Sequence, residues 1–307
     1  MGLRRTAANA LPPSFVRWLG RLQFSVAAAG PAIRWAAAEV ASGESVIRHG
    51  VGAGLRFDAA GTNPGYAMGT SEAAEQRALA AHLRPGGVYY DVGANARFFT
   101  TLAGRQVGPG GRVYGFEPSP ANAAAARTNA ARNGFGHVTI VEAAVADRTR
   151  EAAFVIDPTP TFCHLAAPGE SEALAPGAWA VTVPVTTIDE AVARGELRPP
   201  DYVTIDTEGA ELRVLAGMVE TVRAHRPAAG VIASNCRHPS HGRTVRGNNR
   251  LHRRHGVHPD RRAADRRDVG ASVPVCLGRH AGPERIPVRR PAPAVYPAVR
   301  RRDRRAH

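Results

Sequence analysis

The strongest constraint on the fold is a short apolar run that ends abruptly in an acid and a small-residue turn. Val88–Tyr90 is apolar and stops at Asp91, and Gly93 and Ala94 follow at once. An apolar run of this kind that leads into glycine is typical of a buried strand entering a tight turn.

A helix and a second strand are expected directly after this turn. The sequence predicts a helix over residues 96–107 and a strand over 113–116, which ends on Glu117. A strand–turn–helix–strand unit of this length is the first half of a mononucleotide-binding fold. In such a unit the turn N–H groups and the helix N-terminus face the ligand. The acid after the second strand is placed to hydrogen-bond a ribose diol.

The turn itself differs from a dinucleotide-binding turn. It lacks the full Gly-x-Gly-x-x-Gly and instead has Asp91, Gly93 and Asn95 at alternate positions. A carboxylate here suits a ligand with positive charge near its ribose, as in S-adenosylmethionine. We therefore predict a methyl-donor site at this turn; the alternative is an α/β turn that binds no ligand.

A wider set of motifs between residues ~45 and 227 supports this prediction as a group. They are Gly54–Asp58, Gly65–Glu72, Asp91–Asn95, Gly111–Pro118, Val183–Asp189 and Ile205–Glu211. In content and order these stretches resemble the FkbM-type family of S-adenosylmethionine-dependent methyltransferases. The resemblance implies an α/β fold with a doubly wound, Rossmann-like class I methyltransferase sheet. It also implies methyl transfer to an oxygen nucleophile, a hydroxyl of a sugar or secondary metabolite.

Three residues depart from the family pattern. Arg97 stands where the family usually has glycine, and Thr204 and Thr207 stand where it usually has lysine and valine. Arg97 and the unusual C-terminal part of the chain put the activity of this chain in doubt. A catalytically dead relic or scaffold is therefore the alternative function.

The expected cofactor site follows from strand ends and from the resemblance. Ligands in open parallel sheets bind outside the carboxyl ends of the strands, and acids stand at four expected strand ends. In the family resemblance, the loop that contains Tyr66 and Glu72 sits over the cofactor. The residues expected to contact it are Asp91, Gly93, Ala94, Asn95, Glu117, Pro118, Glu142, Ala143, Tyr66 and Glu72.

The expected catalytic residues follow the fourth core strand, at 201–205. Asp206 is the first candidate for a base or for orienting the acceptor, and Glu208 is the second. Helix capping partly explains acids at these positions. A divalent metal shared by Asp206 and Glu208 is a less favoured alternative, so no metal is predicted.

The positive net charge would suggest a nucleic-acid-binding protein, but the whole excess lies in the C-terminal part of the chain. The chain carries +14, all 40 basic residues are arginine, and residues 237–307 hold 19 of them against five acids. Tyr296 is the only aromatic residue in that segment, whereas single-strand binders interleave aromatics with cations. An arginine-tailed nucleic-acid binder is thus the least favoured function, and the expected partner is a small-molecule or glycan acceptor.

Composition also bears on compartment and domain limits. Three scattered cysteines without a Cys-x-x-Cys, and no secretion signal or transmembrane span, favour a cytoplasmic protein. We expect an N-terminal helical segment over 1–44 and a methyltransferase domain over 45–235. We interpret residues 236–307, rich in Arg, Pro and His, as disordered and out of frame. The sheet is then expected to be incomplete at its C-terminal strands.

Overall fold

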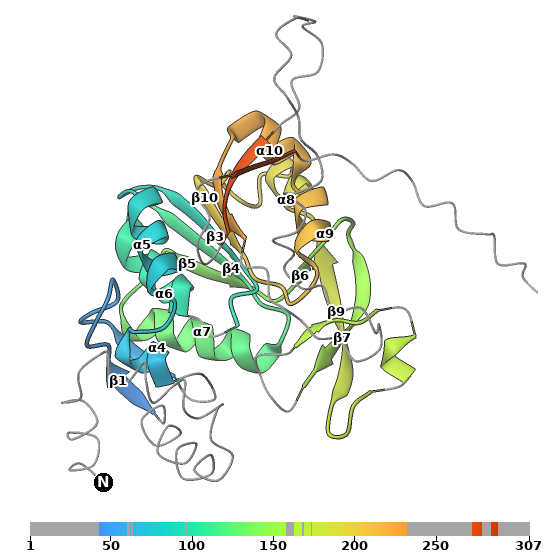
Figure 1. The fold of residues 1–307 in the computed structure, drawn as a ribbon, viewed down its shortest axis with the longest axis horizontal. Helices are drawn as coiled ribbons and strands as arrows, with labels where there is room; N and C mark the ends of the chain where they lie inside the picture. The colour runs from blue at the N-terminus through green and yellow to red at the C-terminus, as the bar shows by residue number, and fades with distance from the viewer. Residues whose placement is uncertain are drawn as a thin grey trace, which may run out of the picture.

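The structure is a computed structural model (Figure 1). It describes residues 43–59, 62, 64–95, 98–157, 163–167, 169–172, 174–231, 272–277 and 284–287. The expected N-terminal helical segment and Arg97 lie outside the described residues, as does most of the chain after residue 231.

The described chain alternates strands and helices through most of its length, in an α/β order. The strands are β1 (Glu44–Val46), β2 (Arg56–Asp58), β3 (Val88–Val92), β4 (Arg112–Phe116), β5 (Val138–Val141), β6 (Ala144–Val145), β7 (Arg150–Ile156), β8 (His164–Leu165), β9 (Trp179–Thr186), β10 (Tyr202–Ile205), β11 (Ala228–Val231), β12 (Ser272–Leu277) and β13 (Glu284–Pro287). The helices are α4 (Pro64–Met68), α5 (Ala73–His82), α6 (Phe98–Val107), α7 (Pro120–Arg132), α8 (Ile188–Ala193), α9 (Glu211–Ala216) and α10 (Val219–His225), with a 3₁₀ turn, η2, at Glu170–Glu172. None of the helices in the described part of the chain is long and apolar enough to cross a membrane.

The central sheet has seven strands in the order β13-β12-β11-β10-β3-β4-β5. Pairing is parallel from β12 to β5, and only β13 runs antiparallel. The chain runs outward from β3 to β5 on one side and then from β10 to β11 on the other. The strand order therefore reverses at β3, which is where ligands bind in doubly wound sheets.

Both faces of this sheet are covered, as the sequence of β3 requires. All five residues of β3 are buried. Val88, Tyr90 and Val92 pack into the core under α8, α9 and α10, whereas Tyr89 belongs to the core beneath α5 and α6. Alternate side chains of a strand point to opposite faces, so one apolar run serves both cores.

Two asparagines, one on α7 and one at its C-terminal cap, hold the edge of the N-terminal β1–β2 hairpin. Asn129 accepts from the backbone N–H of Asp58 at 2.9 Å and donates to its carbonyl at 3.1 Å. Asn133, one helical turn later, makes the same pair of bonds with Arg56 at 3.0 and 2.7 Å. The two side-chain amides thus act as a neighbouring strand and satisfy an edge that would otherwise present unpaired backbone groups.

A second sheet of four strands, in the order β6-β9-β7-β8, stands beside the central sheet (Figure 1). Its own small core includes Phe154, Val183 and Val185. It is formed by the stretch of chain between β5 and β10. One face of it borders the strand ends of the central sheet.

The prediction that the chain after residue 236 leaves the sheet incomplete is wrong for two segments. β12 pairs in parallel with β11, and β13 pairs with β12. Ser272–Leu277 lies within the longest apolar run of that part of the chain, and the open edge of β11 needs a backbone partner. The proposed change of reading frame stays a prediction.

The asparagine pair gives a stability test. Asn129 is fully buried, so Asn129→Ala leaves two backbone groups of Asp58 without partners and should cost about 2–4 kcal/mol of unfolding free energy. Asn133 is partly exposed, so water can replace its side chain, and Asn133→Ala should cost about 1 kcal/mol or less. Urea unfolding measures both, and equal losses would contradict the role of burial.

Candidate functional site

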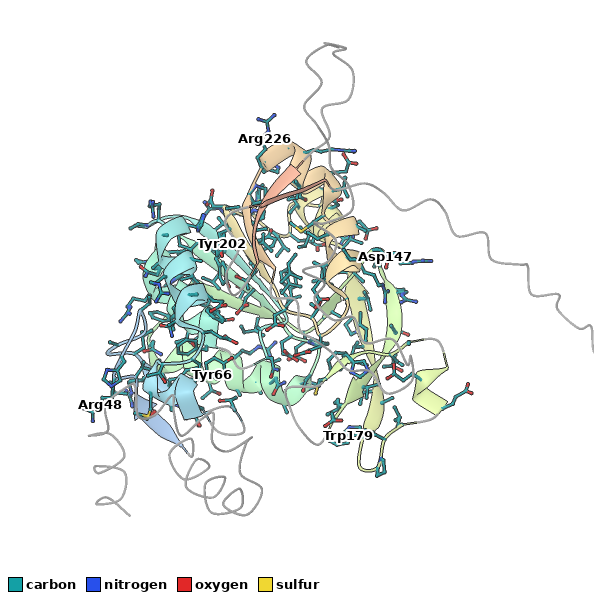
Figure 2. The ribbon with its side chains drawn as sticks, in the orientation of Figure 1. Arg48, Tyr66, Asp147, Trp179, Tyr202 and Arg226 are labelled. Carbon is teal, nitrogen blue, oxygen red and sulfur yellow. The ribbon has the colours of Figure 1, made fainter. Side chains whose placement is uncertain are left out.

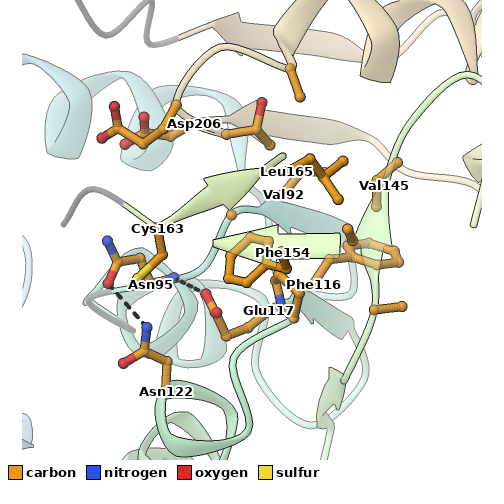
Figure 3. A pocket seen from close by; sticks show the side chains of 17 residues that line it. Val92, Asn95, Phe116, Glu117, Asn122, Val145, Phe154, Cys163, Leu165 and Asp206 are labelled. Atoms are coloured by element: carbon orange, nitrogen blue, oxygen red, sulfur yellow. Dashed lines mark hydrogen bonds between the residues drawn. The ribbon is translucent and has the colours of Figure 1, made fainter. Parts of the chain in front are cut away.

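A pocket lies at the carboxyl ends of β3, β4 and β10, where the strand order reverses (Figure 3). Its empty volume is about 500 Å3, including the part open to solvent. The central sheet, α7 and the second sheet all contribute residues to its wall. The lining residues are Val92, Gly93, Asn95, Phe116, Glu117, Pro118, Asn122, Ala143, Ala144, Val145, Phe154, Cys163, Leu165, Asp206, Thr207, Glu208 and Ala210.

The floor depends on a close backbone approach between two strand ends. Asp206 donates its N–H to the carbonyl of Val92 at 2.9 Å. Gly93 follows with φ +86°, and a Cβ on it would stand 1.9 Å from the carbonyl oxygen of Asp206. Only glycine fits this position, because it is both left-handed and in contact with backbone.

The N–H groups of the turn do not face the pocket, contrary to the sequence-based expectation. Gly93 and Ala94 both donate to the carbonyl of Phe116, at 3.1 and 3.0 Å, and Asn95 donates to Oε2 of Glu117 at 2.8 Å. These bonds tie the turn to the end of β4. The turn therefore positions side chains, and the expected cradle of free amides is not formed by these three groups.

Glu117 is the buried carboxylate of the pocket, with 3% of its surface exposed. Its Oε2 accepts from Asn95, and its Oε1 accepts from the N–H of Ser119 at 2.8 Å. A carboxylate offers about four acceptor positions. The two amide bonds thus fix the orientation of this carboxylate in the pocket.

Asp91 lies beneath the turn, outside the pocket lining. It is buried and accepts from Oγ1 of Thr100 at 2.5 Å and from the hydroxyl of Tyr89 at 3.5 Å. Burial raises the pKa of this carboxyl to about 6, although its hydrogen bonds oppose that change. The structure therefore places Asp91 in the support of the turn, and Ala94 is likewise buried outside the lining.

The loop after β10 brings both predicted catalytic residues, Asp206 and Glu208, to the pocket. Glu208 has φ +52°, a left-handed conformation that is unusual for a non-glycine residue. Oε1 of Glu211 stabilises the loop by accepting from the Thr207 N–H at 3.2 Å and the Gly209 N–H at 2.9 Å. Strained backbone of this kind persists where surrounding bonds enforce it, and it clusters at functional sites.

Glu117 and Asp206 lie on opposite walls of the pocket (Figure 3). β3 separates the strands that carry them. Two strand spacings correspond to about 10 Å. The pocket can therefore hold one group at Glu117 and a second, reacting group at Asp206.

Tyr66 and Glu72 lie outside the pocket lining and contact each other. Burial raises the pKa of Tyr66 well above its usual value, and the charge of Glu72 and its hydrogen bond add to this effect. The charge of Asp206 acts in the same direction, so the phenol is within electrostatic reach of Asp206. Glu72, like Glu208, is left-handed, with φ +49°.

The end of β5 contributes Ala143 to the lining but not Glu142. The side chain of Glu142 forms an ion pair with Arg127 on α7 and is partly exposed. Of these two residues, both expected to contact the cofactor, only Ala143 reaches the pocket.

The second sheet contributes wall residues that sequence reasoning missed: Phe154, Cys163 and Leu165. Burial, followed by nearby carboxylates, raises the pKa of the Cys163 thiol, so it stays protonated near neutral pH. Asn122 was missed as well; its amide donates to Oδ1 of Asn95 at 3.4 Å. No motif in the sequence marks the three wall residues, because they come from an irregular stretch with several Pro and Gly residues.

Two departures from the family pattern have different positions. Thr204 is buried under the pocket and its hydroxyl bonds that of Tyr89, whereas Thr207 lines the pocket. At residue 204, where the family usually has lysine, this chain thus has a neutral threonine buried in the central sheet.

The charge of the lining has one sign. Glu117, Asp206 and Glu208 carry carboxylates, and none of the described lining residues is Arg, Lys or His. Such a lining attracts a cationic ligand and disfavours an anionic one. Within the described residues, no group of three or more His, Cys, Asp or Glu is arranged to hold a metal ion.

Comparison with known families decides the identity of this domain. The family model of the FkbM methyltransferase domain matches residues 91–245. The chain belongs to the FkbM methyltransferase family. The match begins at Asp91 and includes all of the lining residues of the pocket.

Three of the solved structures to which this FkbM-family chain is similar are methyltransferases. An FkbM methyltransferase from Methylobacillus flagellatus KT has 17% identity over 55% of this chain and 41% of its own, with a TM-score of 0.33. A precorrin-6y C5,15-methyltransferase from Geobacter metallireducens GS-15 has 18% identity over 49% of this chain and 56% of its own, with a TM-score of 0.29. A SAM-dependent methyltransferase from Aquifex aeolicus has 14% identity over 47% of this chain and 55% of its own, with a TM-score of 0.27. The chain thus spans about half the length of these proteins. Among curated proteins, none matches it.

Asp91 gives a pH test of the floor of the site. Its pKa is raised from 3.8 to about 6 on folding, so the folded state binds this proton more tightly. The associated stability is present below pH ~4 and is lost as pH rises through ~6. Asp91→Asn removes this loss. The free energy of unfolding of Asp91→Asn, minus that of the parent, should therefore increase by about 2 kcal/mol from pH ~4.5 to pH ~7.5.

Urea unfolding of both proteins at the two pH values measures this difference. Glu151→Gln, an exposed change on β7, is the control and should show no such trend. A pH-independent difference between parent and Asp91→Asn would contradict the raised pKa.

Proposed function

We propose that this chain transfers a methyl group from S-adenosylmethionine to a hydroxyl oxygen of a small molecule or glycan. The observation that carries the proposal is the buried Glu117 carboxylate, held by two backbone amides in a pocket at the reversal of the strand order. Membership of the FkbM methyltransferase family supports the reaction class. The oxygen acceptor rests on the family resemblance.

The lining residues fit this cofactor. Glu117 is positioned to accept hydrogen bonds from ribose hydroxyls, with Asn95 and Pro118 beside it. Ala143, after β5, is positioned to border the adenine. The uniformly acidic lining suits the positive sulfonium. When bound, the cofactor would supply an activated methyl group.

Asp206 is assigned to the acceptor hydroxyl. A hydroxyl that becomes an ether loses its proton, and a carboxylate within hydrogen-bond reach can accept it. Asp206 is the strand-end carboxylate on the wall opposite Glu117. Glu208, whose left-handed backbone is enforced by the loop, is assigned to orienting the acceptor.

The proposal predicts a loss of cofactor affinity on changing Glu117. Glu117→Gln keeps the size of the side chain but replaces one acceptor oxygen with a donor. It should weaken S-adenosylmethionine binding by about 1.5–3 kcal/mol, or roughly 10- to 150-fold in Kd. Isothermal titration calorimetry with S-adenosylmethionine measures this change.

The matched control is Glu142→Gln, because Glu142 lies at the neighbouring strand end but outside the pocket. Its Kd should equal that of the parent. Equal losses in both variants would reject the assignment of Glu117. Failure of the parent chain to bind at micromolar concentration would instead favour a scaffold without activity.

A further inference from the structure

The second sheet has one continuous apolar face. In its pairing register Phe154 stands opposite Val181, and Ile156 stands opposite Trp179. Leu165 stands opposite Phe154 on the other side. Directly opposed residues share a face, as do residues two apart on one strand. These five residues, Phe154, Ile156, Leu165, Trp179 and Val181, are called the apolar strip below.

The apolar strip begins in the pocket and ends at the surface. Phe154 and Leu165 line the pocket. Ile156 and Trp179 are two residues farther out, a distance of about 7 Å along a strand. Ile156 is partly buried, and Trp179 is 51% exposed at the outer end of the sheet (Figure 2).

The exposed end of the strip is not explained by folding. Isolated apolar side chains are common on protein surfaces, as Val46 illustrates on the hairpin. Trp179 differs because it continues a row that forms a pocket wall. A half-exposed tryptophan next to a pocket offers a large, rigid surface for a ligand ring.

Charge narrows the type of ligand. The described pocket lining carries three carboxylates and no cationic side chain, and the apolar strip has no ionisable residue. An anionic molecule, such as a sugar phosphate, would meet repulsion at Asp206 and Glu208, and the described lining residues include no cationic side chain to offset it. A neutral molecule would meet no such repulsion.

We propose that the apolar strip binds the body of the methyl acceptor, and that the acceptor is an uncharged, ring-bearing alcohol. Its hydroxyl reaches Asp206, and its ring system extends about 7 Å beyond the pocket wall onto Ile156 and Trp179. This inference rests on the proposed function, because it assigns the acceptor side of the same site. Trp179 is a specificity-determining residue in this arrangement.

The test uses two fluorescent probes that share one aromatic scaffold. N-phenyl-naphthylamine is neutral, and anilinonaphthalene sulfonate is the same scaffold with a negative charge. Each is titrated into the full-length parent, Trp179→Ala, Trp179→Phe and Thr182→Ala. Thr182 is exposed on the opposite face of β9, so its variant controls for changes in the strand.

The neutral probe should bind the parent more tightly than the sulfonated probe does. Trp179→Ala should weaken the neutral probe about tenfold. Trp179→Phe and Thr182→Ala should bind it nearly as the parent does. Equal affinity for the neutral probe in Trp179→Ala and parent would overturn the inference, as would tighter binding of the sulfonated probe.

Calorimetry with S-adenosylhomocysteine on the same four proteins separates the two proposals. Unchanged affinity in Trp179→Ala is expected, because Trp179 is assigned to the acceptor side. A loss of that affinity would reject the assignment. If the parent itself fails to bind S-adenosylhomocysteine, the proposed function fails, and the acceptor role of the strip fails with it even where the probe still depends on Trp179.

Discussion

The site depends on the backbone contact between the turn after β3 and the end of β10. Gly93 allows it, because any Cβ at this position would overlap the carbonyl of Asp206. The same turn donates two hydrogen bonds to Phe116 at the end of β4. Three strand ends are thereby joined through their main chains, and the side chains of Glu117 and Asp206 are presented on either side of them. Replacing side chains can alter what this pocket binds, but its position is set by backbone.

The sequence was sufficient to predict the central β3–α6–β4 unit and to predict that the site lies at the carboxyl ends of the parallel strands. A buried apolar run, a glycine turn and a second run after a helix leave few alternatives to a parallel βαβ unit. It did not decide which strand-end acids face the pocket. Asp91 and Glu142 are at strand ends like Glu117 and Asp206, yet one supports the turn and the other pairs with a helix. That choice depends on which neighbour each side chain meets, and the local pattern carries no such information.

Long-range contacts account for the remaining differences. Asn129 bonds Asp58, which is 71 residues away, and nothing in the alanine-rich helix identifies it as a partner for a strand edge. Likewise Ser272–Leu277 is a short apolar run in an arginine-rich segment, and its pairing depends on the open edge of β11. The N-terminal segment and Arg97 lie outside the described residues, so predictions about them stay predictions.

The second sheet is attached to the rest of the domain in a way that favours divergence. β6 enters it directly after β5, and β6 and β9 pair over only two residues each. Its core, which includes Phe154 and Val183, is separate from those of the central sheet. Mutations over residues 150–184 that leave the pocket wall unchanged can therefore accumulate without disturbing the two cores of the central sheet. On the proposed assignment, acceptor choice can change through substitutions in one small sheet while the cofactor side stays under constraint.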